Sequence, residues 1–152
     1  MSSKSRDATL LSALVLGCVL FSAGCAPSSQ GIKVRAQGPA IEEAFRRLSL
    51  AISVDGYPVE RADPATFNLE SGWKALTKVE CGADTAGVDA VQEGRITLKM
   101  ARRGALYDVI LTPWVRTQTQ GSGTIAPPTH PLRIKWETVI TRLIEREARD
   151  ED

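Results

Sequence analysis

The strongest constraint on the fold is a stretch in the middle of the chain, residues 95–112, which has strand character on both sides of a turn. In its first half, apolar positions alternate with polar ones: Ile96, Leu98 and Met100 with Arg95, Thr97 and Lys99. Residues 102–105 then supply a turn, and a second run with strand character follows at 106–112. Because every second side chain of a strand lies on the same face, this pattern predicts an antiparallel hairpin with an apolar face.

A second hairpin is predicted upstream of the first. Residues 57–61 alternate between apolar and polar, a turn with a proline follows at 62–65, and residues 67–74 alternate again. The segment 78–93 combines small and acidic residues without a helical stripe, which predicts a loop that includes part of a strand. Proline cannot donate to a strand ladder, so Pro113 predicts an edge position or a bulge at the end of the downstream hairpin.

Two amphipathic helices enclose the hairpins. They are predicted at 39–53 and at 131–148, because apolar residues recur there at helical spacing. The first residues of the second helix, 132–136, also alternate with period two, so a short strand there is an alternative. A polar loop rich in glycine and proline is predicted at 117–129.

The order of these elements predicts an α+β fold. We expect a two-layer sandwich, in which an antiparallel sheet of about four strands carries an N-terminal and a C-terminal helix on one face. The sequence contains no internal repeat, so a single domain is expected.

The N-terminus has the layout of an export signal. Lys4 and Arg6 are followed by an apolar run without charges, residues 8–21, and small residues precede Cys25. A positive start, a hydrophobic middle and small residues before a cleavage site are the features that signal peptides share. Because the run is shorter than the roughly 20 apolar residues of a spanning helix, we expect cleavage or anchoring at this end.

The segment Ser22-Ala23-Gly24-Cys25 resembles the bacterial lipoprotein box. The resemblance implies that Cys25 receives a diacylglycerol thioether and that the chain is cut just before it. Ser22 occupies the position where this family usually has leucine. The alternatives are the box-like segment Val15–Cys18, which leaves an apolar core of about seven residues, and a plainly secreted, periplasmic protein. By the sorting rule of such lipoproteins, Ala26 implies transfer to the outer membrane, with the domain facing the periplasm.

These features divide the chain into four parts. We expect a signal peptide at 1–24, a lipidated cysteine with a flexible tether at 25–38, a single α+β domain at 39–148 and a charged tail at 149–152. Removal of the signal peptide leaves 17 basic and 17 acidic residues. We therefore expect no net field that would attract nucleic acid or acidic lipid. Cys81 would remain as a free thiol, so no intrachain disulfide is expected.

No pattern in the sequence predicts catalytic chemistry. The chain contains one histidine, His130, and a lone histidine cannot form a metal cluster, so we expect no metal, cofactor or catalytic residue. A thiol enzyme that uses Cys81 with His130 is the remaining enzymatic hypothesis. The candidates for partner binding are Trp114, which lies beside a proline, and Arg102 and Arg103, whose alternative role is to protect a strand edge.

The order of features along the chain is similar in outline to the helix-and-sheet modules of BamC-type lipoproteins. These features are an anchored cysteine, a tether and an amphipathic helix, followed by the segments 56–63 and 70–73. Those proteins are accessory parts of the outer-membrane protein assembly machinery. With the small domain and the lack of a catalytic pattern, the resemblance implies a non-enzymatic, membrane-anchored envelope lipoprotein that acts as a scaffold or an assembly and interaction module. The alternative is a module that binds a small lipid or glycan in a cavity lined by Phe67, Leu69, Ile96 and Leu98.

Overall fold

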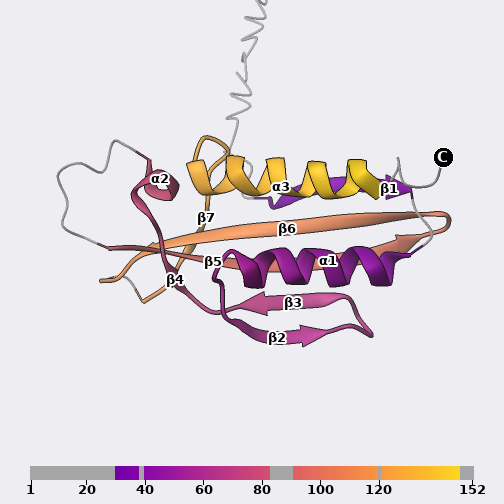
Figure 1. Ribbon diagram of the computed structural model, residues 1–152. Coiled ribbons are helices and arrows are strands. Elements are labelled where there is room, and N and C mark those ends of the chain that lie inside the picture. Colours follow the sequence, from indigo (N-terminus) through magenta and orange to yellow (C-terminus); the bar gives the residue numbers. More distant parts are fainter. Residues whose placement is uncertain (1–29, 38–39, 83–90, 120, 148–152) are drawn as a thin grey trace, which may run out of the picture.

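The computed structural model of the chain describes residues 30–37, 40–82, 91–119 and 121–147. These residues form an α+β fold with an antiparallel sheet and three helices (Figure 1). The fold class predicted from the alternating and helical patterns is confirmed. The predicted signal peptide, the lipidated Cys25 and the predicted charged tail lie outside the described residues.

The sheet of the described residues contains seven strands, so the prediction of about four strands is wrong. Five strands follow the order β1-β6-β5-β3-β2, and two short strands, β4 and β7, pair with β5 and β6. The strands that the sequence did not predict have two to six residues, which is too short for a clear pattern. The bounds are Ile32–Gln37 for β1, Val59–Asp63 for β2, Asn68–Ser71 for β3, Lys74–Ala75 for β4, Gln92–Arg103 for β5, Leu106–Thr117 for β6 and Thr124–Ile125 for β7.

Both predicted hairpins are present. The downstream hairpin, β5 and β6, is longer than predicted, with 12 residues in each strand and with Leu98 opposite Leu111. Gly104 in its turn has φ 66°, a conformation that glycine adopts without steric strain. The upstream hairpin is β2 and β3, and β3 pairs with β5. Alternation therefore gives this part of the sheet one apolar and one polar face.

The two long helices are α1 (Ile41–Val54) and α3 (Pro131–Glu147), close to the predicted ranges. Residues 132–136 lie within α3, so the alternative of a strand there is wrong. Helix α1 contacts α3 and β5, and α3 contacts β1 and β6; both helices are drawn in front of strands in Figure 1. One hydrophobic cluster takes side chains from helices and strands alike, among them Phe45, Leu48, Ile52, Leu69, Ile96, Leu98, Val109, Leu111, Trp136 and Ile140.

The prediction of a flexible tether at 25–38 is wrong for residues 32–37, which form β1. Ile32 and Ala36 are buried, whereas Lys33 and Arg35 between them are exposed. The strand pairs with β6 along its whole length. Six residues of alternation next to a segment rich in proline, serine and glycine were too weak a signal, but burial of the apolar positions against the cluster stabilises the strand.

Two segments predicted as loops contain regular structure. Helix α2 (Lys78–Cys81) begins with a capping box, in which the Thr77 hydroxyl and the Glu80 carboxylate each accept a hydrogen bond from the other residue's backbone N–H. A single turn is too short to show an apolar stripe, so the periodicity did not reveal it. In the polar loop predicted at 117–129, β7 pairs with β6, with Ile125 opposite Trp114.

Pro113 lies inside the sheet and not at its edge, so that expectation is wrong. The residue is opposite Ile96 of β5. On the other side of β6, the pairing with β1 ends at Leu111 and the pairing with β7 begins at Trp114. The Pro113 carbonyl accepts a hydrogen bond from the N–H of Ala126 (2.9 Å). Because the N and O atoms of one strand residue point to the same side, the missing N–H of the proline faces this gap between two ladders.

The guanidinium of Arg133 fills that gap. Arg133 lies in the first turns of α3 and is 8% exposed. Its Nη1 donates to the carbonyl of Gln30 (2.8 Å), just before β1, and to the carbonyl of Ala126 (3.2 Å), just after β7. A side chain thus supplies the donor that a proline cannot, and it joins α3 to both short ladders.

Four charged side chains join the ends of the helices. The Lys135 ammonium of α3 contacts both carboxylate oxygens of Asp55 (2.6 and 2.7 Å), at the end of α1, and Glu80 of α2 (2.8 Å). Lys74 of β4 donates to the Asp55 carbonyl (2.6 Å) and lies 3.5 Å from Glu80. Burial alone would raise the pKa of Glu80, but hydrogen bonds from Lys135 and Thr77 outweigh it and lower the pKa to about 2.

Candidate functional site on the open face of the sheet

One face of the sheet carries the polar side chains that alternate with the core residues, and we call it the open face. None of its side chains is fully buried. The strand registers place them on one side. The open face consists of Lys33 and Arg35 from β1, Arg61 and Asp63 from β2, Asn68 and Glu70 from β3, Glu93, Arg95, Thr97, Lys99 and Arg103 from β5, and Asp108, Ile110, Thr112, Trp114 and Arg116 from β6.

Basic side chains outnumber acidic ones on this face. Seven of its residues are lysine or arginine and four are aspartate or glutamate, whereas the whole chain has a net charge of only +1. The charge is therefore segregated, and this surface carries three more basic than acidic side chains (seven against four). Summing charges along the sequence hides such segregation; reading only the outward positions of the strands would have revealed it.

Four of the seven basic side chains form ion pairs within the face. Arg35 and Arg103 share the carboxylate of Asp108 (2.9 and 2.7 Å), and their hydrogen bonds and charges lower the pKa of Asp108 despite its partial burial. The other two pairs are Arg116 with Glu93 (2.7 Å) and Arg95 with Glu70. Within the described part of the chain, Lys33, Arg61 and Lys99 have no ion pair.

Aromatic side chains stand at one end of the open face. The ring of Trp73, just after β3, lies under the guanidinium of Arg116 at 4.1 Å and within 5.9 Å of that of Arg95. Trp114 is half-buried, and its indole N–H donates to the Thr97 hydroxyl (3.3 Å). Gly123 permits close approach to Trp73, because a Cβ there would lie 2.2 Å from the ring.

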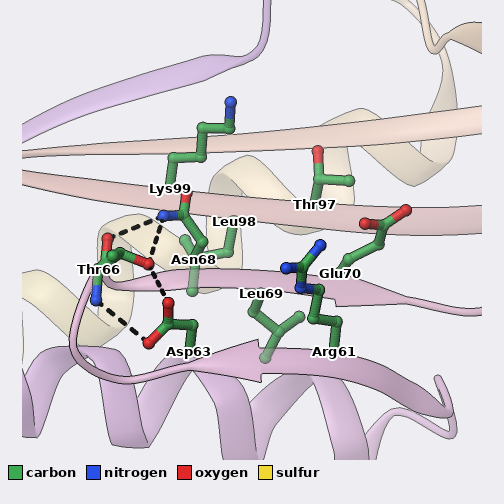
Figure 2. Close-up of a pocket in the computed structure, with 9 residues that line it drawn as sticks. All are labelled: Arg61, Asp63, Thr66, Asn68, Leu69, Glu70, Thr97, Leu98 and Lys99. Atoms are coloured by element: carbon green, nitrogen blue, oxygen red, sulfur yellow. Dashed lines mark hydrogen bonds between the residues drawn. The ribbon is translucent and has the colours of Figure 1, made fainter.

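A hollow of about 370 Å³ opens on this face across β2, β3 and β5 (Figure 2). Its position is held by a chain of hydrogen bonds: the Asn68 amide donates to the carbonyl and the hydroxyl of Thr66 (2.9 Å each), and the Thr66 hydroxyl donates to Asp63 (2.7 Å). The lining residues are Arg61, Asp63, Thr66, Asn68, Leu69, Glu70, Thr97, Leu98 and Lys99.

A second hollow, of about 420 Å³, lies on the same face at the β1 edge, where Arg35 and Arg103 meet Asp108. Lys33 and Ile110 also line it. Both basic groups that contact Asp108 are largely exposed, with 63% and 70% of their side chains accessible. This hollow is therefore a basic depression whose arginines already share an acidic partner.

The three residues predicted for partner binding do not form one site. Trp114 and Arg103 both lie on the open face, but they stand at opposite ends of the β5–β6 hairpin. Trp114 is opposite Arg95, eight residues from Arg103 along β5, or about 26 Å. Arg102 points to the other face and pairs with Glu42 of α1 (2.5 Å). Because side chains alternate along a strand, neighbouring arginines of a hairpin cannot act together on one flat partner.

The residues of the enzymatic hypothesis show no activation. Burial, and then the charge of Glu80, raise the pKa of the Cys81 thiol, which is the direction opposite to that of an activated nucleophile. The Nδ1 atom of His130 accepts the backbone N–H of Leu132 (3.2 Å), and burial lowers the pKa of the imidazole. In the described ranges, no three histidine, cysteine or acidic side chains are placed to hold a metal ion.

No protein-family model matches this chain, and no curated protein matches it. In the part of the chain that the structure describes, no helix is long and apolar enough to cross a membrane. The open face and its hollows are therefore interpreted from their own chemistry.

Proposed function

We propose that this chain is a non-enzymatic lipoprotein of the cell envelope and that its open face binds an anionic component of the envelope. In this proposal Cys25 carries the lipid, the domain faces the periplasm from the outer membrane, and the protein acts as a scaffold or interaction module. The two long helices form one layer on the apolar face of the sheet, which leaves the opposite face for the partner. The observation that carries the proposal is the excess of basic side chains on that face.

The geometry of the N-terminus supports a role close to the membrane. Gln30 is the first described residue, and its carbonyl is held by Arg133. Four residues lie between it and Cys25, and the five Cα-to-Cα steps from Cys25 to Gln30 span at most about 18 Å in an extended chain. A lipid on Cys25 would therefore keep the sheet within reach of the membrane surface and of the components that assemble there.

The alternative of a small-ligand module with an apolar cavity has less support. Leu69, Ile96 and Leu98, which would line such a cavity, are at most 3% exposed and belong to the hydrophobic cluster, and Phe67 packs against the same cluster with its ring 5.8 Å from that of Phe45. Packing of these side chains against one another stabilises the fold. The proposed binding surface is therefore the open face.

Lipidation of Cys25 is tested by the intact mass of the protein extracted from membranes. We expect a chain that begins at Cys25 and carries a diacylglycerol group and further acyl groups. Cys25→Ser should abolish this modification, whereas the matched Cys18→Ser variant should keep it. A mature chain that begins at an unmodified alanine or serine, or a modified cysteine at position 18, would contradict this prediction.

Binding through the open face is tested by a photoreactive amino acid placed at Thr112, in the centre of β6, and as a control at Thr138, exposed on α3. We expect the first variant to cross-link one anionic envelope component in cells and the second to leave it uncaptured. Added salt should weaken the capture, because it screens attraction between exposed charges beyond about 10 Å. Equal capture from both positions, or capture that salt does not change, would argue against the proposal.

A further inference from the structure

The hollow across β2, β3 and β5 has the composition of a binding site for a small anionic polyol. We propose that it binds a phosphate ester that carries neighbouring hydroxyl groups, with the phosphate between Arg61 and Lys99. This inference rests on the proposed function, since it names the chemistry that part of the open face recognises. The same chemistry occurs in a glycerol-type phospholipid headgroup and in a free glycerol or sugar phosphate.

The two basic side chains that flank the hollow are available to an anion. Arg61 is opposite Glu70 of β3, and Lys99 is opposite Asn68. Their strands, β2 and β5, lie on either side of β3, about 10 Å apart. Both side chains are exposed and, within the described residues, neither forms an ion pair. The two residues are offset by two positions along β3, and both side chains are long enough to reach one phosphate bound above that strand.

The acidic side chains of the hollow are already engaged by other groups. Asp63 accepts hydrogen bonds from the Thr66 hydroxyl (2.7 Å) and from the backbone N–H groups of Ala65 (3.0 Å) and Thr66 (3.4 Å). These bonds lower the pKa of Asp63, and the charge of Arg61 contributes less. Glu70 is paired with Arg95. The charges of the two flanking cations are therefore not cancelled by a direct contact, and an incoming anion can use them.

The remaining polar groups suit hydroxyl groups next to the phosphate. Both N–H groups of the Asn68 amide are directed at Thr66, which leaves the amide oxygen of Asn68 to accept from a ligand. The hydroxyl of Thr97, which accepts the indole N–H of Trp114, can still donate. A volume of about 370 Å³ accommodates a glycerol phosphate. Because most of the lining residues stand on paired strands, the position of the hollow is fixed before a ligand arrives.

The test is a titration of the full chain, in neutral detergent and at constant ionic strength, with glycerol 3-phosphate, followed by calorimetry or NMR shifts. We expect saturable binding, and we expect Arg61→Gln and Lys99→Gln each to weaken it about tenfold, as loss of a hydrogen bond to a charged group would. The matched control is Lys33→Gln. It removes the same charge from the same face, but Lys33 lies beyond β6, opposite Ile110, and lines the other hollow.

The outcomes separate the two sources of the ligand and the two proposals. A lipid headgroup would be supported as the source if the chain binds dispersed short-chain phosphatidylglycerol but not phosphatidylcholine. Arg61→Gln should then weaken the binding of phosphatidylglycerol as well. Binding of glycerol 3-phosphate alone would support a free phosphate ester. An absence of saturable binding, or equal weakening by Lys33→Gln, would overturn the inference. In that case cross-linking from Thr112 would still report on the proposed function independently.

Discussion

Replacement of Arg133 by methionine should lower the free energy of unfolding by about 2–4 kcal/mol. Methionine fills a similar volume but leaves the carbonyls of Gln30 and Ala126 without the donor that Arg133 supplies. A buried carbonyl without a partner costs about 1–3 kcal/mol, and two carbonyls lose their donor here. The measurement is urea unfolding of the full chain, followed by the fluorescence of its three tryptophans.

A second substitution, at Pro113, should partly restore the stability of the Arg133→Met variant. Pro113→Val introduces a backbone N–H that faces the same gap, so it should restore part of the lost stability in the Arg133→Met background. The matched control is Arg46→Met, since Arg46 is 67% exposed and contacts Glu43 on the surface of α1. That variant should unfold almost as the wild type does. Equal destabilisation by both methionine variants, or no rescue by valine, would refute the role assigned to Arg133.

Replacement of Glu80 by glutamine should lower the free energy of unfolding by about 2 kcal/mol at neutral pH. Glu80 is 5% exposed. When its negative charge is removed, Asp55 is the acidic side chain that still pairs with both Lys74 and Lys135. Removal of one member of a fully buried ion pair costs about 3–5 kcal/mol. We expect less here, because about a third of the Lys135 side chain is exposed.

The effect of Glu80→Gln should depend on pH in a defined direction. The pKa of Glu80 is lowered from 4.5 to about 2 in the folded protein. The stabilisation from its charge is therefore fully present above about pH 4.5 and is lost as the pH falls through about 2. Urea unfolding of the wild type and the variant across this window should show their difference shrinking.

Glu43 supplies the matched control for this titration. Its pKa is also lowered to about 2, by hydrogen bonds from Arg46 and Arg47, but it lies on the solvated side of α1. Exposed ion pairs contribute little to stability, so Glu43→Gln should have a much smaller effect at every pH. A difference for Glu80→Gln that does not change with pH would show that its packing matters and its charge does not.

The segregation of charge connects these structural results to the proposed function. The residues that stabilise the fold, such as Arg133 and Glu80, are buried and are occupied by their partners. Arg61 and Lys99, by contrast, stand exposed on the open face and have no ion pair within the described residues. Variants of Arg61 or Lys99 should therefore weaken ligand binding without changing the free energy of unfolding. A weaker affinity in the titration can then be assigned to the lost side chain and not to a destabilised fold.

Local periodicity accounts for the parts of the fold that could be predicted. Hairpins β2–β3 and β5–β6 and helices α1 and α3 each show several repeats of a period of two or 3.6 residues. Strand β1, helix α2 and strand β7 have six, four and two residues. Such short elements are stabilised by what they pack against, and a pattern of that length does not distinguish them from a tether or a loop.

The candidate site was less accessible to prediction than the fold. Arg102 and Arg103 are adjacent in sequence but lie on opposite faces, and Trp114 stands at the far end of the same hairpin. Conversely, Arg61 and Lys99 are 38 residues apart in sequence and line the same hollow only because β3 pairs with both of their strands. A polar residue on a strand indicates an outward position, but its neighbours on that face depend on strand order.

The amino-acid sequence alone determined the α+β class, the two long helices and the existence of a polar sheet face, because these follow from interactions between residues that are close along the chain. The tertiary structure decided which basic residues share that face, which of them have an acidic partner, and how a buried arginine supplies the donor that a proline lacks. Those outcomes depend on pairing between distant strands, which side-chain burial and hydrogen bonding select and which no local pattern encodes.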